Sequence, residues 1–249
     1  MSESELGWRL EWRSGSVGEL HTLEEGPFSR TARVCEAEGE AVVLSSAMSA
    51  ELLAGQAGSA SGVIRSGVEV ARRRSGGGIV HLVPDAHVWI DVLLPRGDLL
   101  WTDDVSQSGE WLAEVWIRAL GDMGVVGATM ADAHWSDPEL GRIVCFAATG
   151  PGEIVVGERK LVGISQRRNR HGARFQCVVY LNQEPEAVLG FLDVGAIGED
   201  LMGRLAQALT ERVLTLEGAG VTGGISETDV TGEDVVDAFF SRLPGAVPG

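Results

Sequence analysis

The order of apolar segments is the feature that most constrains the fold of this chain of 249 residues. Short runs of branched and apolar residues, typical of strands, are mixed with a few segments that repeat at helical spacing. They do not follow the regular strand–helix alternation of a parallel sheet. We therefore predict an α+β fold, with a largely antiparallel mixed sheet flanked by helices.

The strands that this pattern predicts lie at residues 41–45, 63–65, 68–70, 79–83, 87–94, 142–148, 153–156, 159–166 and 173–181. Pro84-Asp85 is a turn signal, so we expect 79–83 and 87–94 to form an antiparallel pair. Val156-Gly157-Glu158 predicts a tight hairpin between the two strands that flank it.

Three segments have helical spacing. Residues 108–120 are the clearest, because their apolar residues fall on one face: Trp111, Leu112, Val115, Trp116, Ala119 and Leu120. Residues 199–214 form a second amphipathic helix, with Leu201, Leu205, Leu209 and Val213 on the expected buried face. Glu233 and Asp234 begin a last helix of about ten residues. We expect a catalytic domain over 1–215, followed over 216–249 by a glycine-rich loop, this helix and a tail.

Charge and composition narrow the classes of function. The net charge of −16 argues against general binding of nucleic acid, whose affinity depends on cationic contacts to phosphate. No apolar run is long enough to span a bilayer, and Met1 to Glu5 are acidic rather than signal-like. Three cysteines do not suggest a disulfide framework. We expect a cytoplasmic protein that has neither a nucleic-acid nor a membrane partner.

Positive charge gathers in two segments of this acidic chain. The first is Arg72-Arg73-Arg74, and the second contains Arg159, Lys160, Arg167, Arg168, Arg170 and Arg174. Such clusters indicate a local anionic ligand or an acidic partner. The alternative is that these side chains pair with the abundant carboxylates.

Lys160 is the only lysine, beside 19 arginines. Lysine differs from arginine in carrying a compact, rotatable ammonium whose pKa shifts readily on burial. The single lysine therefore indicates a site whose chemistry needs an ammonium. The alternative is a chance surface lysine in a chain whose arginine bias reflects a GC-rich genome.

Three consecutive glycines follow the first arginine cluster, in Arg72-Arg73-Arg74-Ser75-Gly76-Gly77-Gly78. Glycines permit positive φ and let a ligand lie directly against the backbone, while the arginines suit a phosphate or carboxylate. The segment is not a P-loop, because the Gly-Lys-Ser/Thr ending and the following helix are missing. The alternative is a flexible turn.

Cys145 stands before a glycine-proline loop, at the expected end of a strand. A nearby lysine favours the thiolate as an ammonium, accepts a proton as a neutral amine, or holds an acyl carbonyl oxygen. Cys35 and Cys177 fit inert core positions, since Cys177 lies within an expected strand.

Two motifs carry a resemblance to a known family. The arginine-glycine segment resembles the Arg-Arg-x-x-Gly-Gly-Gly signature of lipoate–protein ligases and octanoyltransferases. Gly157 to Arg167, around Lys160 and Gly163, resembles that family's Gly-x-Lys-x-x-Gly-Ser-Ala-Gln segment. The resemblance covers about residues 40–195 and implies the class II synthetase/biotin–lipoate ligase fold. It also implies that Lys160 contacts the carbonyl of the bound acyl group.

Cys145-Phe146-Ala147-Ala148 is similar to a segment of the cysteine-dependent octanoyltransferases. This similarity implies transfer of an octanoyl or lipoyl group through a Cys145 thioester to a lysine of a carrier domain, with no cofactor required. The resemblance makes Cys145 and Lys160 the catalytic residues. It gives the following residues contact with the acyl substrate: Arg72, Arg73, Arg74, Ser75, Gly76, Gly77, Gly78 and Gly163. No metal ligands are predicted.

Two other activities stay open within the family. An ATP-dependent ligase would use ATP and Mg to form an acyl-adenylate, and a non-catalytic member would bind the acyl group or the carrier. The family's His-Asp pair is replaced here by Leu82-Val83. The implied partners are acyl carrier protein or a lipoyl-bearing carrier, namely the glycine cleavage carrier protein or the lipoyl domain of a 2-oxoacid dehydrogenase.

Overall fold

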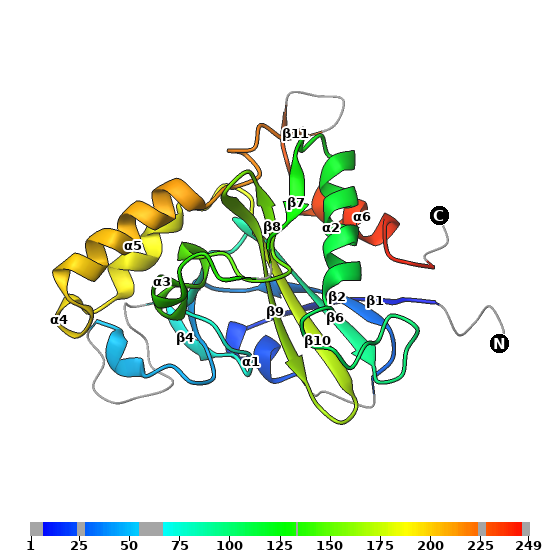
Figure 1. The fold of residues 1–249 in the computed structure, drawn as a ribbon, viewed down its shortest axis with the longest axis horizontal. Helices are drawn as coiled ribbons and strands as arrows, with labels where there is room; N and C mark the ends of the chain where they lie inside the picture. Colours follow the sequence, from blue (N-terminus) through cyan, green and yellow to red (C-terminus); the bar gives the residue numbers. More distant parts are fainter. Residues whose placement is uncertain (1–6, 24–27, 55–66, 133, 224–227, 246–249) are drawn as a thin grey trace.

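A seven-stranded sheet forms the centre of the computed structural model, which describes residues 7–23, 28–54, 67–132, 134–223 and 228–245. All neighbouring strands pair antiparallel, except that β1 and β2 run parallel. The order across the sheet is β1 (Arg9–Gly15), β2 (Thr31–Ala37), β6 (His87–Pro95), β10 (Gly172–Tyr180), β9 (Arg159–Arg168), β8 (Ile154–Val156) and β7 (Ala128–Met130). The predicted α+β class with a largely antiparallel sheet is confirmed (Figure 1).

A second, three-stranded sheet has the order β4 (Glu69–Arg72), β3 (Ala41–Leu44), β5 (Val80–Leu82). The predicted pairing of 79–83 with 87–94 is wrong, because β5 pairs with β3 and β6 lies between β2 and β10. A turn does form at Pro84-Asp85, where Asp85 has φ 60°. The turn carries the chain from one sheet to the other, since long-range partners occupy the edges of both strands. The strand expected at 63–65 lies outside the described residues.

Alternation along the central strands gives the large sheet two different faces. On β6, Val88, Ile90 and Val92 join the main hydrophobic core. Between them, Trp89 packs with residues of the small sheet, and Asp91 is fully buried beside it. The large sheet therefore has one face on the main core and a second face toward the small sheet.

Two helices cover the core face. They are α2 (Glu110–Asp122) and α6 (Gly232–Ser241), which pack against each other and lie close together in Figure 1. Both helices were predicted. None of the helices within the described ranges is long and apolar enough to cross a bilayer.

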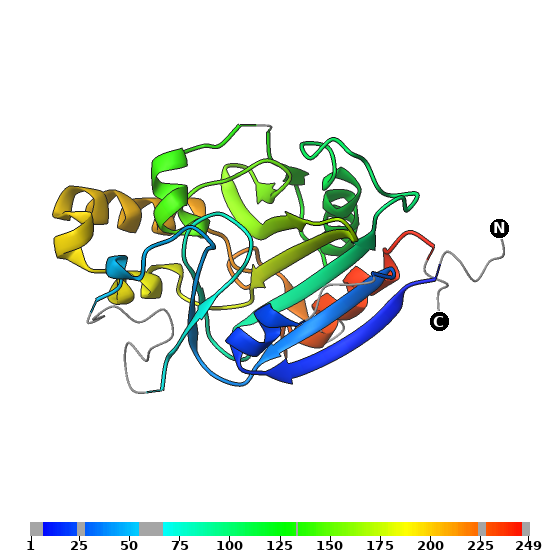
Figure 2. The same cartoon turned by 90° about the horizontal axis from the view of Figure 1, so that it is seen from below.

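The other helices gather toward the face opposite the main core and toward one end of the sheet. The short α1 (Val17–Thr22) packs on β4, and Figure 2 shows it beside the β1 edge of the sheet. The predicted helix at 199–214 is α5 (Glu199–Arg212), preceded by α4 (Val194–Ile197). On α5, Leu205 and Leu209 are buried as expected, and Val213 follows them, whereas Leu201 is half-buried.

The remaining short elements connect these layers. The predicted hairpin at Val156-Gly157-Glu158 is confirmed between β8 and β9, where Gly157 has φ 61°. The elements are η2 (Ala50–Leu52), η4 (Pro185–Phe191), β11 (Thr222–Gly223) and β12 (Thr228–Asp229).

The strand predicted at 142–148 is wrong. The chain forms α3 (Pro138–Ile143) and then a 3₁₀ turn, η3 (Cys145–Ala147). Asp137 caps α3 by accepting a hydrogen bond from the backbone N–H of Leu140, and Pro138 suits the first helical position. The segment resembled a strand because it is apolar, but its apolar residues pack against α5, and its strand pairing is limited to one isolated bridge between Val144 and Ile79.

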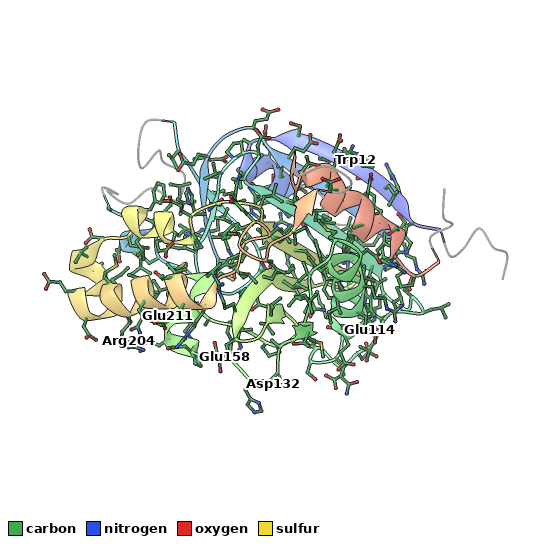
Figure 3. All side chains as sticks on the ribbon, turned by 90° about the horizontal axis from the view of Figure 1, so that it is seen from above. Trp12, Glu114, Asp132, Glu158, Arg204 and Glu211 are labelled. Carbon is green, nitrogen blue, oxygen red and sulfur yellow. The ribbon has the colours of Figure 1, made fainter. Side chains whose placement is uncertain are left out.

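The main core predicts a clear difference between two positions on α2. Trp116 is fully buried against Phe239 of α6, with ring centroids 4.6 Å apart, so Trp116→Ala should lower the free energy of unfolding by about 3–5 kcal/mol. Glu114 on the same helix is exposed (Figure 3), and Glu114→Ala should change it by less than about 1 kcal/mol. Urea unfolding of both variants measures the difference, and equal losses would contradict this packing.

Candidate active site

Cys145 begins the η3 turn, and the residue after the glycine run holds that turn in place. The backbone N–H of Cys145 donates to the carbonyl of Ile79 at 2.9 Å. In return, the N–H of Ile79 donates to the carbonyl of Ile143 at 2.8 Å. The two segments that the sequence singled out, although far apart along the chain, are thus joined directly by backbone hydrogen bonds.

The glycine run allows this close approach. A Cβ on Gly78 would lie 2.7 Å from the backbone N of Cys145 and equally close to backbone atoms of Gly141 and Ile143. Gly77 has φ 100°, and a Cβ there would lie 2.9 Å from the Arg73 guanidinium and 3.6 Å from Cys145 Sγ. These positions require glycine for a structural reason.

The buried guanidinium of Arg73 fixes the glycine run. It donates to the carbonyls of Gly76 at 2.8 Å and Gly78 at 2.7 Å. Burial lowers its pKa, and nearby acidic groups, Cys145 and Glu153 among them, oppose that shift. Arg73 therefore places a positive charge behind the backbone that contacts the thiol.

Lys160 is fully buried on β9 and lies beside the η3 turn. Its Nζ donates to the carbonyls of Cys145 at 2.9 Å and Ala148 at 3.2 Å, and it lies 3.9 Å from Cys145 Sγ. Nζ also lies 4.8 Å from the centre of the Phe146 ring, within the range of a cation–π contact. The single lysine is therefore not a chance surface residue.

Glu153 is the buried counter-ion of Lys160, with Oε1 2.6 Å from Nζ. Burial raises the pKa of this carboxyl, and the Lys160 ammonium works against that rise. Backbone N–H groups of Gly150 and Ile164 also donate to the carboxylate. The sequence motifs did not point to Glu153. The signal that could have found it was the hairpin, which brings residues just before β8 next to β9.

A largely apolar cavity opens beside Cys145, between the two sheets. Its volume is about 40 Å³. Its walls are His21, Val43, Arg73, Val80, Leu82, Trp89, Cys145, Phe146, Gly163, Ile164, Ser165, Gln176 and Val178. Its largely apolar walls suit an alkyl chain.

Some of the predicted site residues line the cavity, and others lie next to it. Cys145, Arg73 and Gly163 line the cavity, and a Cβ on Gly163 would lie 3.1 Å from the Phe146 ring. Ser75 lies next to it, with its hydroxyl 3.0 Å from that of Ser165, a cavity residue. Gly76 has open space around it.

A second, more open hollow adjoins the cavity and shares Arg73 with it. Its walls are Ser46, Arg72, Arg73, Arg74 and Arg167. Arg72 donates to the carbonyls of Ser45 and Met48, whereas Arg74 is exposed. The first predicted basic cluster therefore does face a common space that an anion can enter.

The second predicted basic cluster is not a surface patch. Lys160 and Arg174 are buried in ion pairs with Glu153 and Asp91. Arg168 stacks on Trp101, with its guanidinium carbon 4.2 Å from the ring centre. The cluster disperses because all its residues but Arg170 lie on two paired strands, whose successive side chains point to opposite faces.

The other two cysteines lie away from the cavity. Cys177 packs in the main core, where burial raises the pKa of its thiol to about 12. Burial also raises the pKa of the Cys35 thiol well above its usual range. A thiol with a raised pKa is a poor nucleophile, so both fit the inert role that the sequence predicted.

Sequence reasoning missed one side of the cavity. His21 on α1, Trp89 on β6 and Gln176 on β10 come together there. No local motif contains them, and only the packing of α1 on the sheet brings His21 to this place. Among the described residues, no group of three or more His, Cys, Asp or Glu side chains is placed to hold a metal ion.

The glycine run gives a matched pair of substitutions. Gly78→Ala forces a Cβ against three backbone groups of the Cys145 turn, so we expect it to lower the free energy of unfolding by about 1–3 kcal/mol and to displace the thiol. Gly76→Ala meets open space and should be close to neutral. Thermal unfolding and the alkylation rate of Cys145 measure the two effects, and a neutral Gly78→Ala would contradict the close approach.

Solved structures of other proteins have a similar fold. A bipartite lipoate protein ligase from Thermoplasma acidophilum, solved in work that includes its E2 lipoyl domain, matches with a TM-score of 0.66 at 14% identity. The match covers 94% of this chain and 81% of that one. A lipoate-protein ligase A bound with ATP matches with a TM-score of 0.63 at 14% identity, over 94% and 83% of the two chains. At such identities these likenesses show the fold.

Sequence comparison gives the family. No curated protein matched the chain in a sequence search. The family described as the lipoyl protein ligase A/B catalytic domain matches residues 56–239. This range includes the arginine-glycine segment, Cys145 and the segment around Lys160. With this match and the class II synthetase-like fold of its structural neighbours, the chain belongs to the lipoyl protein ligase A/B catalytic domain family.

Proposed function

We propose that this protein is an acyltransferase that moves an octanoyl or lipoyl group through a Cys145 thioester to a lysine amine of a lipoyl-type carrier domain. The observation that carries this proposal is the position of the Cys145 thiol. It lies at the wall of a largely apolar cavity, 3.9 Å from a buried ammonium. An adenylating ligase has no chemical need for a thiol at that point.

In the first step, the Cys145 thiolate attacks the carbonyl carbon of an acyl thioester. A C–S bond to Cys145 forms, the donor's C–S bond breaks, and the donor thiolate takes up the proton that Cys145 lost. The acyl chain lies in the cavity against apolar residues such as Val80, Leu82 and Val178. Dividing the transfer into two steps is the usual advantage of a covalent nucleophile.

In the second step, the unprotonated amine of the carrier lysine attacks the same carbonyl carbon. An amide C–N bond forms and the bond to Cys145 breaks. The proton released by the amine returns to the sulfur. The enzyme is regenerated with no net oxidation or reduction.

Lys160 stabilises the negative charge that develops on the acyl carbonyl oxygen in both steps. Its three N–H groups are directed at two carbonyls and Glu153, so the ammonium is held in place before any substrate binds. Of the three contacts of Nζ to oxygen atoms, the one to the Ala148 carbonyl is the longest, at 3.2 Å. We expect this contact to be exchanged for one to the acyl carbonyl oxygen. A charge fixed in a site that excludes water stabilises a developing oxyanion strongly.

The arginine-lined hollow supplies a place for the anionic part of the donor. Arg72, Arg74 and Arg167 surround it next to the cavity. A phosphopantetheine phosphate entering there would direct its thioester toward Cys145. The acidic face of an acyl carrier protein suits the same positive charges.

Intact-mass analysis tests the proposal. After incubation with octanoyl-acyl carrier protein, the wild-type chain should gain the mass of one octanoyl group, and Cys145→Ala should gain none. Cys177→Ala removes a buried thiol on the opposite face of the sheet and should still be acylated. No adduct on the wild type, or an adduct that persists in Cys145→Ala, would contradict the proposal.

A second candidate is an ATP-dependent lipoate–protein ligase. The arginines of the hollow favour it, since they suit an acyl-adenylate phosphate as well as phosphopantetheine. The structures with the same fold include one bound with ATP and another, a T. acidophilum protein described as a lipoate protein ligase, with bound lipoic acid. Full ATP-dependent lipoylation by Cys145→Ser, with free lipoate, would favour this activity over the thioester route.

A further inference from the structure

One polar atom in the cavity wall lacks a partner. His21 is only 6% exposed, yet among the described residues its Nε2 makes no hydrogen bond. The side chain lines the same cavity as Cys145. Leaving a buried polar group without a partner costs free energy, so native structures rarely keep one without a reason.

The hydrogen bonds around His21 determine its tautomer. The Ser75 hydroxyl donates to Gln176 Oε1 at 3.2 Å, which orients the Gln176 amide. The Nε2 of Gln176, which can only donate, lies 3.1 Å from His21 Nδ1. Nδ1 is therefore the acceptor, and the ring proton of neutral His21 is on Nε2.

The surroundings keep the ring neutral. Burial lowers the pKa of His21 well below its usual value, and the positive charges of Arg174 and Arg73 lower it further. Arg174 also fixes the end of α1, because its guanidinium donates to the carbonyls of His21 and Leu20. His21 therefore presents a fixed N–H donor. It is not a general base, since the lone pair of Nδ1 is already engaged.

His21 and Cys145 lie over different strands. The His21 ring packs on Trp89 of β6 at 4.5 Å between ring centres and bonds to Gln176 of β10. Cys145 is next to Lys160 of β9. Neighbouring strands are about 4.8 Å apart, so the donor lies away from the sulfur, along the cavity. A group bound at His21 is therefore on the acyl chain and not at the reacting carbonyl.

We propose that the Nε2–H of His21 binds a hydrogen-bond acceptor on the chain of the acyl substrate, and that the enzyme prefers a medium-chain acyl group carrying an oxygen acceptor to plain octanoyl. This inference rests on the proposed acyl-binding role of the cavity. Most of the wall around His21 is apolar, as with Val43, Leu82 and Trp89, so an acceptor on the ligand gains a partner that an alkyl chain cannot use.

Isothermal titration calorimetry with free acids tests the inference without turnover. The probes are octanoate, 6-oxo-octanoate and 7-oxo-octanoate, whose ketone oxygens can only accept. One of the oxo acids should bind the wild-type protein about tenfold more tightly than octanoate does, which corresponds to one hydrogen bond gained in a buried site.

Two substitutions of His21 separate the two ring nitrogens. His21→Asn keeps an acceptor near Nδ1 for Gln176 but has nothing at Nε2, so it should bind the oxo acid and octanoate equally. His21→Gln places an amide nitrogen near Nε2 and should retain part of the preference. For each variant the readout is the ratio of its affinity for the oxo acid to its affinity for octanoate, and a thermal melt shows whether the variant is folded.

Each outcome decides one claim. Equal affinities of the wild-type protein for octanoate and both oxo acids would overturn the role of His21 and leave the acyl cavity intact. A preference that survives in His21→Asn would also overturn it. Failure of all three acids to bind, together with no acyl adduct from octanoyl-acyl carrier protein, would instead remove the proposed function. The wild-type comparison stands by itself if a variant fails to fold.

Discussion

The buried ammonium of Lys160 is the interaction on which the site depends. It joins β9 to the Cys145 turn through two carbonyls, and Glu153 balances its charge. Removing one partner of such a pair leaves an uncompensated buried charge, which typically costs about 3–5 kcal/mol. The same contacts hold the charge close to Cys145 Sγ. The ion pair that stabilises this part of the fold therefore also places a positive charge beside the thiol.

The two faces of the large sheet separate packing from function. One face supports the main core under α2 and α6, where Cys177 is buried. The other face, with the small sheet opposite it, encloses the cavity and its polar residues, including His21 and Gln176. Strand alternation makes this division, because neighbouring residues on β6 and β10 point to opposite sides. Gln176 and Cys177, adjacent on β10, thus lie in the cavity wall and in the main core respectively.

Much of the fold could be predicted from local pattern. Apolar periodicity placed α2, α5 and most of the strands, and the α+β class followed from their order. It failed for α3 and η3, because an apolar segment buried by tertiary contacts has no period that distinguishes it from a strand. It also failed for the partner of β5, because a turn determines a change of direction but not which strand pairs with which.

The sequence by itself singled out one lysine, a run of three glycines and Cys145, because these residue types have chemical or steric properties that other residues lack. Only the tertiary structure decided why. Gly78 is required by the backbone of the Cys145 turn, Lys160 is neutralised by Glu153, and His21 enters the cavity from a distant helix. Those relations join residues far apart along the chain or across a hairpin. They arise from tertiary packing, and no local sequence motif predicts which helices and strands will pack together.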